Sequence, residues 1–192
     1  MILTEGLKSL YAATIDRSKF REVATRLIVF VLPLFFWGRE PRWSGIIIAA
    51  IGVLIRAWGA GYLKKDQEMA HGGPYLLVRH PLYLGSCILS LGLIVSLHHW
   101  FVTIMIGGVT LLQYWHTIRH EEAQLRQRFG TKYQEYEKVV RPLWPTPASI
   151  RYYFSHKKES EFSFAQYLKN KEYECLLGVV VVFVLLKVGA HH

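Results

Sequence analysis

Hydrophobic residues in this chain come in long blocks that are separated by polar, basic segments. The blocks cover residues 23–37, 45–63, 81–97, 100–118 and 176–188. Blocks of nearly twenty residues have the length that a bilayer-spanning helix requires. The last block is shorter, and we interpret it as a short span because its centre is nearly all valine, leucine and phenylalanine. The pattern predicts an all-α integral membrane protein with about five transmembrane helices.

Short breaks between the blocks predict how the helices connect. Only His98 and His99 separate the third block from the fourth, so residues 81–118 are expected to form an antiparallel helical hairpin. Gly130 is expected to end the helix that continues past the fourth block. Three prolines within residues 141–149 predict a non-helical crossing at the surface. The polar region after the hairpin is thus expected to form a cytosolic C-terminal extension.

Composition and charge narrow the class of partner. The chain has 192 residues, 52% of them hydrophobic and 19% charged, and its formal net charge is +9. We expect residues 1–192 to form a single domain, with a cofactor-binding core at about 64–145. Such a positive charge suits either nucleic acid or an anionic membrane surface. Because the Lys and Arg residues flank the apolar blocks, we predict a membrane partner and no nucleic acid.

The distribution of Lys and Arg also predicts an orientation. Basic residues are concentrated in the segments 64–80 and 119–172, whereas the turn within the hairpin contains neither Lys nor Arg. The positive-inside rule places the N-terminus and both basic segments in the cytoplasm, of either a bacterial plasma membrane or an endoplasmic reticulum. Residues 151–172 mix aromatic residues with Lys and Glu, which is typical of an interfacial segment.

Arg56 and the two cysteines lie in or beside apolar blocks. A charge is costly in hydrocarbon, and Arg56 is about two turns from Lys64, so its side chain is expected to snorkel to the interface. Cys87 and Cys175 lack metal-ligand spacing, so they are expected to pack as small apolar residues. No metal site is predicted.

Charged and aromatic residues gather at one end of the predicted hairpin. Residues 73–85 read Gly-Pro-Tyr-Leu-Leu-Val-Arg-His-Pro-Leu-Tyr-Leu-Gly and open it, and Glu121 and Glu122 close it at the same depth. The helix that starts at Pro81 presents unpaired backbone N–H groups, which favour an anion. These groups beside apolar spans predict a site for a charged cofactor next to a lipid-like substrate. Four further residues of the pattern follow: Phe129, Gly130, Tyr133 and Tyr136.

This ordered set of residues, from Lys64 to Pro145, resembles the isoprenylcysteine carboxyl methyltransferases and the wider membrane group that includes phospholipid N-methyltransferases. The resemblance implies S-adenosylmethionine as methyl donor, held between the ends of the hairpin and covered by the C-terminal polar segments. It also implies methyl transfer to a hydrophobic or lipid-linked acceptor, such as an isoprenylcysteine carboxylate or a phospholipid amine. The implied donor contacts are Tyr75, His80, Pro81, Leu82, Tyr83 and Glu121.

The chain departs from the family pattern at two places. Where family members have a His-x-Leu-Val segment, residues 67–70 read Gln-Glu-Met-Ala. Where they have an arginine that meets the substrate, this chain has Thr117, and Arg119, two residues further on, is the candidate to replace it. A carboxylate acceptor needs no base, whereas an amine or thiol acceptor makes His80 or Glu122 a candidate base.

Two other functions remain open from the sequence. Membrane sterol and enone reductases carry similar hairpins with an Arg-His step and use NADPH, and a catalytically silent module would bind lipid through the basic region. Each site residue also has a purely structural interpretation. Arg79 and His80 would face lipid headgroups, the tyrosines would form an interfacial belt, and the glutamate pair would be a solvated helix start. The acceptor atom and the oligomeric state stay open.

Overall fold

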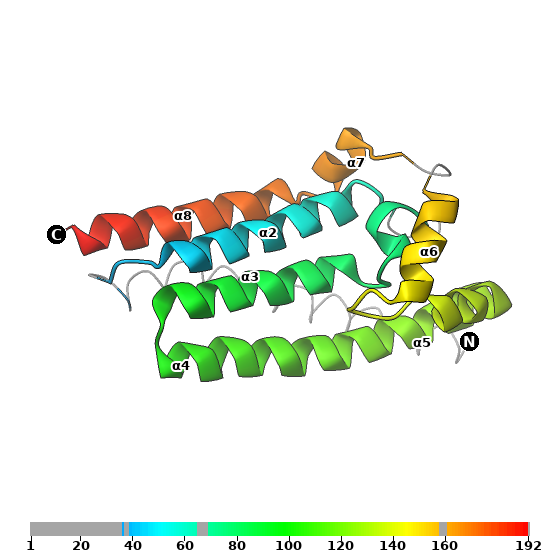
Figure 1. Ribbon diagram of the computed structural model, residues 1–192, viewed down its shortest axis with the longest axis horizontal. Coiled ribbons are helices and arrows are strands. Elements are labelled where there is room, and N and C mark those ends of the chain that lie inside the picture. The colour runs from blue at the N-terminus through cyan, green and yellow to red at the C-terminus, as the bar shows by residue number, and fades with distance from the viewer. Residues whose placement is uncertain (1–35, 37–38, 65–68, 158–160, 192) are drawn as a thin grey trace, which may run out of the picture. The chain divides into compact units, whose positions relative to one another are not determined.

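The computed structural model describes residues 36, 39–64, 69–157 and 161–191, which are helical or irregular and contain no strand (Figure 1). The chain divides into two compact units, and the unit Pro41–Leu177 contains every predicted site residue. The first apolar block lies almost entirely outside the described residues. The helical elements are α2 (Trp43–Ala60), η1 (Gly73–Leu76), α3 (Pro81–Leu97), α4 (Trp100–Val102), the π-helix η2 (Thr103–Gly107), α5 (Gly108–Val139), α6 (Pro147–His156), α7 (Phe164–Lys169) and α8 (Tyr173–Ala190).

Helices α2 and α3 pack against each other with their backbones in contact. A Cβ atom added to Gly52 would lie 2.5 Å from the backbone nitrogen of Leu89, and one added to Gly92 would lie 2.4 Å from that of Ala49. Such spacing excludes any side chain, and small residues at helix interfaces allow this close approach in membrane proteins. The glycines of this interface are Gly45, Gly52, Gly85 and Gly92.

The predicted hairpin is confirmed. α3 begins at Pro81 and ends at Leu97, and His98 adopts the left-handed conformation (φ 45°, ψ 50°) that turns the chain. The returning arm runs through α4 and η2 into α5. Between the two arms, the hydroxyls of Ser90 and Thr110 lie 3.1 Å apart. The hairpin therefore brings the start of α3 beside the middle of α5.

Gly130 interrupts α5 as predicted. Its φ of 52° and ψ of −128° are not helical, so two helical segments meet there. The segment after it buries Tyr133, Tyr136 and Val140 in a cluster with flanking apolar residues. Tyr133 and Tyr136 are 1% and 6% exposed, so they do not form an interfacial belt. The second half of α5 therefore packs against the protein itself.

The crossing after α5 is shorter than predicted. Residues 140–146 are irregular, but α6 already begins at Pro147. Proline is compatible with the first helical position, where no N–H is needed. Thr146 caps the helix by accepting a hydrogen bond from the Ser149 backbone N–H, at 3.1 Å. The prediction that the crossing extends to residue 149 is therefore wrong in its last three residues.

The predicted snorkelling of Arg56 is also wrong. Its guanidinium forms a two-pronged ion pair with Glu172, with Nε to Oε2 at 3.0 Å and Nη2 to Oε1 at 2.8 Å. The partner carboxylate comes from the residue just before α8, and the pair lies within the unit Pro41–Leu177. An ion pair within the protein removes the need to reach the interface.

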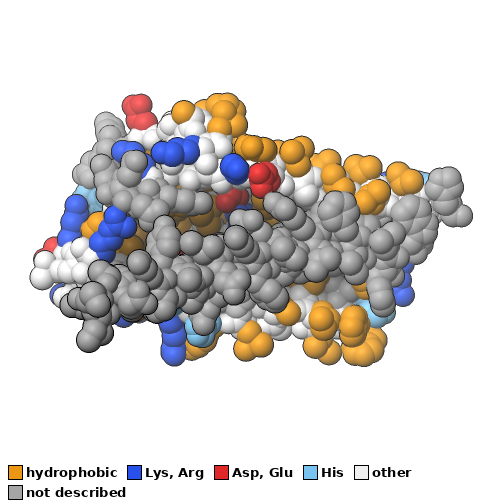
Figure 2. All heavy atoms as spheres, turned by 180° about the vertical axis from the view of Figure 1, so that it is seen from behind, with side chains coloured by type: hydrophobic (Ala, Val, Ile, Leu, Met, Phe, Trp, Pro, Cys, Tyr) orange, Lys and Arg blue, Asp and Glu red, His pale blue; other side chains and the backbone are white. Residues whose placement is uncertain are grey.

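The membrane character of the chain is supported by helix length and composition. Helices α2 and α8 are each long and apolar enough to cross a bilayer, and α3 is a shorter apolar helix. Large apolar side chains stay exposed on α4, η2 and the first part of α5, among them Trp100, Ile104 and Leu112. Figure 2 shows hydrophobic side chains exposed on one face, with most of the visible Lys and Arg side chains toward the left of the view. Five spans and one domain over 1–192 stay predictions.

Candidate functional site

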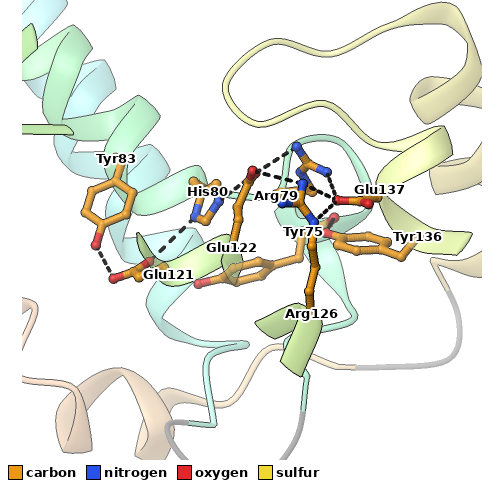
Figure 3. A network of polar contacts seen from close by, with 9 residues as sticks. All are labelled: Tyr75, Arg79, His80, Tyr83, Glu121, Glu122, Arg126, Tyr136 and Glu137. Carbon is orange, nitrogen blue, oxygen red and sulfur yellow. Dashed lines mark hydrogen bonds and ion pairs between the residues drawn. The ribbon is translucent and has the colours of Figure 1, made fainter. Parts of the chain in front are cut away.

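A network of charged and aromatic side chains joins three segments at the start of α3 (Figure 3). The loop before α3 and the first turn of that helix supply one group of residues. The middle of α5 supplies a second group, and the helical segment after Gly130 supplies a third. The residues drawn are Tyr75, Arg79, His80, Tyr83, Glu121, Glu122, Arg126, Tyr136 and Glu137.

The loop that carries the Arg-His-Pro step is fixed on two sides. On one side, the Tyr136 hydroxyl donates a hydrogen bond to the backbone carbonyl of Tyr75 in η1. On the other side, the N–H of Arg79 donates to the carbonyl of Arg141 at 2.8 Å, and the N–H of His80 donates to that of Pro142 at 3.0 Å. The chain after α5 therefore holds this loop against the start of α3.

His80 lies between the two neighbouring glutamates. Its ring is 6% exposed, with Nδ1 3.7 Å from Oε2 of Glu121 and Nε2 3.4 Å from Oε1 of Glu122. The ring also stacks at a tilt on Tyr83, with the centroids 5.6 Å apart. Because both ring nitrogens face carboxylates, the imidazole is oriented from both sides.

Glu121 and Glu122 are neighbours in sequence but occupy different environments. The Glu121 side chain is 41% exposed and accepts a hydrogen bond from the Tyr83 hydroxyl. The Glu122 side chain is 11% exposed and lies 2.7 Å from Nη2 of Arg79. Burial alone would raise the pKa of Glu122, but the His80 hydrogen bond and the charges of Arg79, His80 and Arg126 outweigh it and lower the pKa. Glu122 is thus held as a carboxylate, while Glu121 remains reachable.

Arg79 is a buried part of the network rather than a headgroup anchor. Its side chain is 8% exposed, and its Nη1 lies 3.4 Å from Oε2 of Glu137. Arg126 binds the same Glu137 oxygen from Nη2 at 2.8 Å. Among the described residues, Nε of Arg79 and the hydroxyl of Tyr133 are buried without a hydrogen-bond partner. Unsatisfied buried donors are costly, so both are available to a ligand with acceptor atoms.

Comparison with known proteins shows which protein family the sequence around this network resembles. A sequence model of the phospholipid methyltransferase family matches residues 41–132, which include α2, the hairpin and the glutamate pair. The match covers just under half of the chain, so the chain is similar to the phospholipid methyltransferase family over this part. No solved structure matches it.

Curated proteins match overlapping parts of the chain. Protein-S-isoprenylcysteine O-methyltransferase of Schizosaccharomyces pombe is 36% identical over 40% of the chain and 32% of its own length. Protein-S-isoprenylcysteine O-methyltransferase A of Arabidopsis thaliana is 31% identical over 56% of the chain and 62% of its own length. The cobalt-zinc-cadmium resistance protein CzcN of Cupriavidus metallidurans is 29% identical over 62% of the chain and 60% of its own length. The matches thus span less than two thirds of each relative.

The predicted site residues fall into two groups. His80, Tyr83, Glu121 and Glu122 contact one another, and Tyr75 and Pro81 lie buried beside them. The structure does not join the other two predicted residues, Leu82 and Arg119, to this network. Leu82 is half-buried, with its carbonyl 3.3 Å from Nη1 of Arg56, and Arg119 is exposed, with its guanidinium 4.3 Å from the centre of the Trp115 ring.

Sequence reasoning missed two residues of the site. Glu137 bridges Arg79 and Arg126, and Tyr114 stacks on Tyr83 with the ring centroids 5.0 Å apart. Helical spacing would have found both. Glu137 is four residues after Tyr133, and Tyr114 is seven residues before Glu121, so each shares a face with a residue already singled out.

Proposed function

We propose that this chain is an integral membrane methyltransferase that moves a methyl group from S-adenosylmethionine to a hydrophobic or lipid-linked acceptor at the membrane–cytoplasm boundary. The observation that carries the proposal is the position of His80 between Glu121 and Glu122 at the first turn of an apolar helix. The match of residues 41–132 to the phospholipid methyltransferase family and the likeness to isoprenylcysteine O-methyltransferases support it.

The residues of the network fit the chemistry of this donor. Its ammonium and ribose hydroxyls suit the exposed carboxylate of Glu121, and its carboxylate suits the orphaned donors of Arg79 and Tyr133. Its sulfonium suits the aromatic faces of Tyr75 and Tyr83, at ~0.5–2 kcal/mol for each contact. When bound, the donor would supply an electrophilic methyl group.

The chain contributes mainly orientation. A methyl transfer is an in-line displacement, and correct positioning of two reactants is worth ~7–11 kcal/mol. Arg79 and Glu122 hold the loop and α5 together at 2.7 Å, which fixes His80 and Glu121 relative to each other. Rigid side chains on helices suit this task better than a mobile loop does.

The acceptor decides whether a base is needed. A carboxylate acceptor is already nucleophilic, whereas an amine must first lose its proton. The lowered pKa of Glu122 makes it a weak base, so His80 is the better candidate and Glu122 has a positioning role. We keep Arg119 as the candidate for meeting the acceptor, because its stacking on Trp115 places a cation beside an exposed aromatic ring.

The experiment is calorimetric binding of S-adenosylmethionine and S-adenosylhomocysteine to detergent-purified protein. We expect both compounds to bind the parent, with His80→Ala and Glu121→Ala each weakening the affinity at least tenfold. Glu135→Ala is the matched control, because Glu135 is an exposed glutamate on α5 that takes no part in the network. NADPH is titrated in parallel.

Two results would overturn the proposal. If neither sulfur compound binds the folded parent, the chain does not use this donor. If NADPH binds instead and His80→Ala abolishes that binding, a reductase is the better interpretation. Equal losses in Glu135→Ala and Glu121→Ala would show that the effect is general and not tied to the site.

A further inference from the structure

Arg56 is the central residue of a second polar cluster, separate from the network around His80. Its side chain lies on α2 and is 21% exposed, and that of its partner Glu172 is 12% exposed. The guanidinium binds both carboxylate oxygens of Glu172. It also donates from Nη1 to the hydroxyl of Ser86 and to the carbonyl of Leu82, the latter at 3.3 Å. One cation therefore joins α2, the first turns of α3 and the chain that enters α8.

The partner carboxylate is itself anchored to the end of α2. Two residues before Glu172, the side-chain amide of Asn170 donates to the carbonyls of Ala60 and Leu63, both at 2.8 Å. Ala60 is the last residue of α2, and Leu63 lies just after the turn that follows it. Lys171, between the two anchors, adopts a φ of 56°. The segment that contains Asn170 and Glu172 is thus fastened to α2 at two points.

The contacts of Arg56 reach the turn of α3 that carries predicted donor contacts. Leu82 lies between Pro81 and Tyr83, and its carbonyl accepts from both Arg56 and the Ser86 hydroxyl. A Cβ on Gly85 would lie 2.6 Å from Cγ of Arg56, so the arginine stem lies directly against this turn. From the same turn, Tyr83 reaches toward α5 and binds Glu121. Arg56 thus holds one side of the turn whose other side carries the site.

A charge pair in this place needs an explanation beyond stability. Apolar residues of similar volume often stabilise a protein as well as a buried ion pair does, because they require no desolvation of charges. Ionisable residues within membrane helices commonly mark functional regions. The bonds from Arg56 to α3 offer such a role, since an apolar pair would fill the space without fixing the Leu82 carbonyl.

We propose that Arg56, paired with Glu172, is a positioning residue that holds the first turn of α3 in the register needed for donor binding. The proposal rests on the proposed function and adds a residue that acts through Leu82 and Ser86 rather than by touching the donor. Glu172 sets the direction of the guanidinium, and the hydrogen bonds to the Leu82 carbonyl and the Ser86 hydroxyl hold the first turn of α3 in place.

The test replaces the pair by apolar residues of similar volume. In Arg56→Met with Glu172→Leu, we expect a thermal unfolding midpoint within a few degrees of the parent and a Kd for S-adenosylhomocysteine raised at least tenfold. Arg56→Lys keeps the charge, but one ammonium cannot bridge Glu172 and both groups on α3, so we expect a similar loss. Ser86→Ala leaves the ion pair intact and should raise Kd two- to fivefold. Lys187→Met with Glu40→Leu removes an exposed pair and is the control.

Hydrogen exchange in the donor-free proteins is the second readout. We expect faster exchange at residues 80–88 in the Arg56 variants and parental exchange along the rest of α3. A parental Kd in the folded double variant would overturn the proposal. If that variant does not fold, a parental Kd in both Arg56→Lys and Ser86→Ala would do so. Failure of the parent itself to bind would refute the proposed function instead, and unchanged exchange at 80–88 would then also refute the positioning role.

Discussion

The two sides of α3 are held by opposite kinds of interaction. Along its length, α3 meets α2 through glycines whose backbones touch, with no room for a Cβ atom. At its first turn, it meets α5 and the segment after Gly130 through His80, Arg79 and the glutamate pair. One interface depends on shape, and the other depends on charge. We expect the first interface to be insensitive to pH and intolerant of added volume, and the second to be sensitive to pH.

This difference separates scaffold from site within one helix. Close backbone packing leaves no freedom to shift, because interiors have almost no void to absorb a displacement. The polar end keeps some exposed groups, such as the half-exposed Glu121. A rigid scaffold ending in a partly accessible charged turn is what ligand orientation requires. The predictions below test each interface in turn.

The largest effect is expected at the glycine interface. In Gly52→Leu, the new Cβ would lie 2.5 Å from the Leu89 nitrogen and 2.6 Å from the Gly85 carbonyl oxygen. Backbone cannot yield as a side chain does, so we expect a loss of at least about 3 kcal/mol in unfolding free energy. The thermal unfolding midpoint in detergent measures it. Gly108→Ala is the control, since a Cβ there meets nothing within 4 Å. That change should stabilise by about 0.5–1 kcal/mol.

The next effect is expected at the buried ion pair. Glu122→Gln keeps the shape but leaves Arg79 without its closest partner charge, at 2.7 Å. Breaking one side of such a pair costs about 3–5 kcal/mol when it is fully buried. Because Glu137 still pairs with Arg79, we expect about 2–3 kcal/mol by denaturant unfolding. The exposed Glu135→Gln should change stability by less than about 0.5 kcal/mol. Equal losses in both variants would contradict a special role for Glu122.

Two neighbouring tyrosines provide a finer comparison. Tyr136→Phe removes the donor to the Tyr75 carbonyl and leaves a buried acceptor unsatisfied, so we expect a loss of about 1–2 kcal/mol. Tyr133→Phe removes a buried hydroxyl that has no partner among the described residues, so it should be neutral or stabilising in the donor-free protein. Equilibrium unfolding of the two variants side by side checks this. A larger loss from Tyr133→Phe would mean that its hydroxyl is satisfied in solution.

The smallest effect is the dependence of stability on pH. The pKa of Glu122 is lowered in the folded protein, so its contribution is complete above the unfolded pKa of about 4.3 and is lost as the pH falls through the folded pKa. Unfolding free energy measured between pH 7 and pH 3 should therefore fall less steeply for Glu122→Gln than for the parent. Gly108→Ala should retain the parental slope, because a Cβ there meets nothing within 4 Å and the change adds no titrating group. An unchanged slope in Glu122→Gln would place the acid sensitivity elsewhere.

Local features of the sequence predicted much of the site. The interval between the Arg-His-Pro step and the glutamate pair, with a two-residue turn in between, was enough to bring His80 beside Glu121 and Glu122. It worked because a helical hairpin has a fixed rise per residue on both arms. The same reasoning did not reveal that Arg79 is buried. An arginine at a predicted membrane boundary has the same local pattern whether it faces lipid or a carboxylate.

Arg56 marks the limit of local reasoning most clearly. Its partner Glu172 is 116 residues away, and no periodicity connects the two. Helical spacing from Tyr133 could have singled out Glu137, but its pairing with Arg126 across 11 residues depends on the turn at Gly130. Pairing over such separations depends on how helices pack, which a single sequence does not display.

By itself the sequence determined the apolar helices α2, α3 and α8 among the described residues, the bounds of α3, the break at Gly130 and the residues that meet around His80. Block length, proline and glycine act on neighbouring residues only, so their consequences can be read along the chain. Tertiary structure alone decided which glutamate is buried, which cation each carboxylate binds and that Arg56 turns inward. Those outcomes depend on burial and on distances between distant segments, and electrostatic energy changes steeply with both.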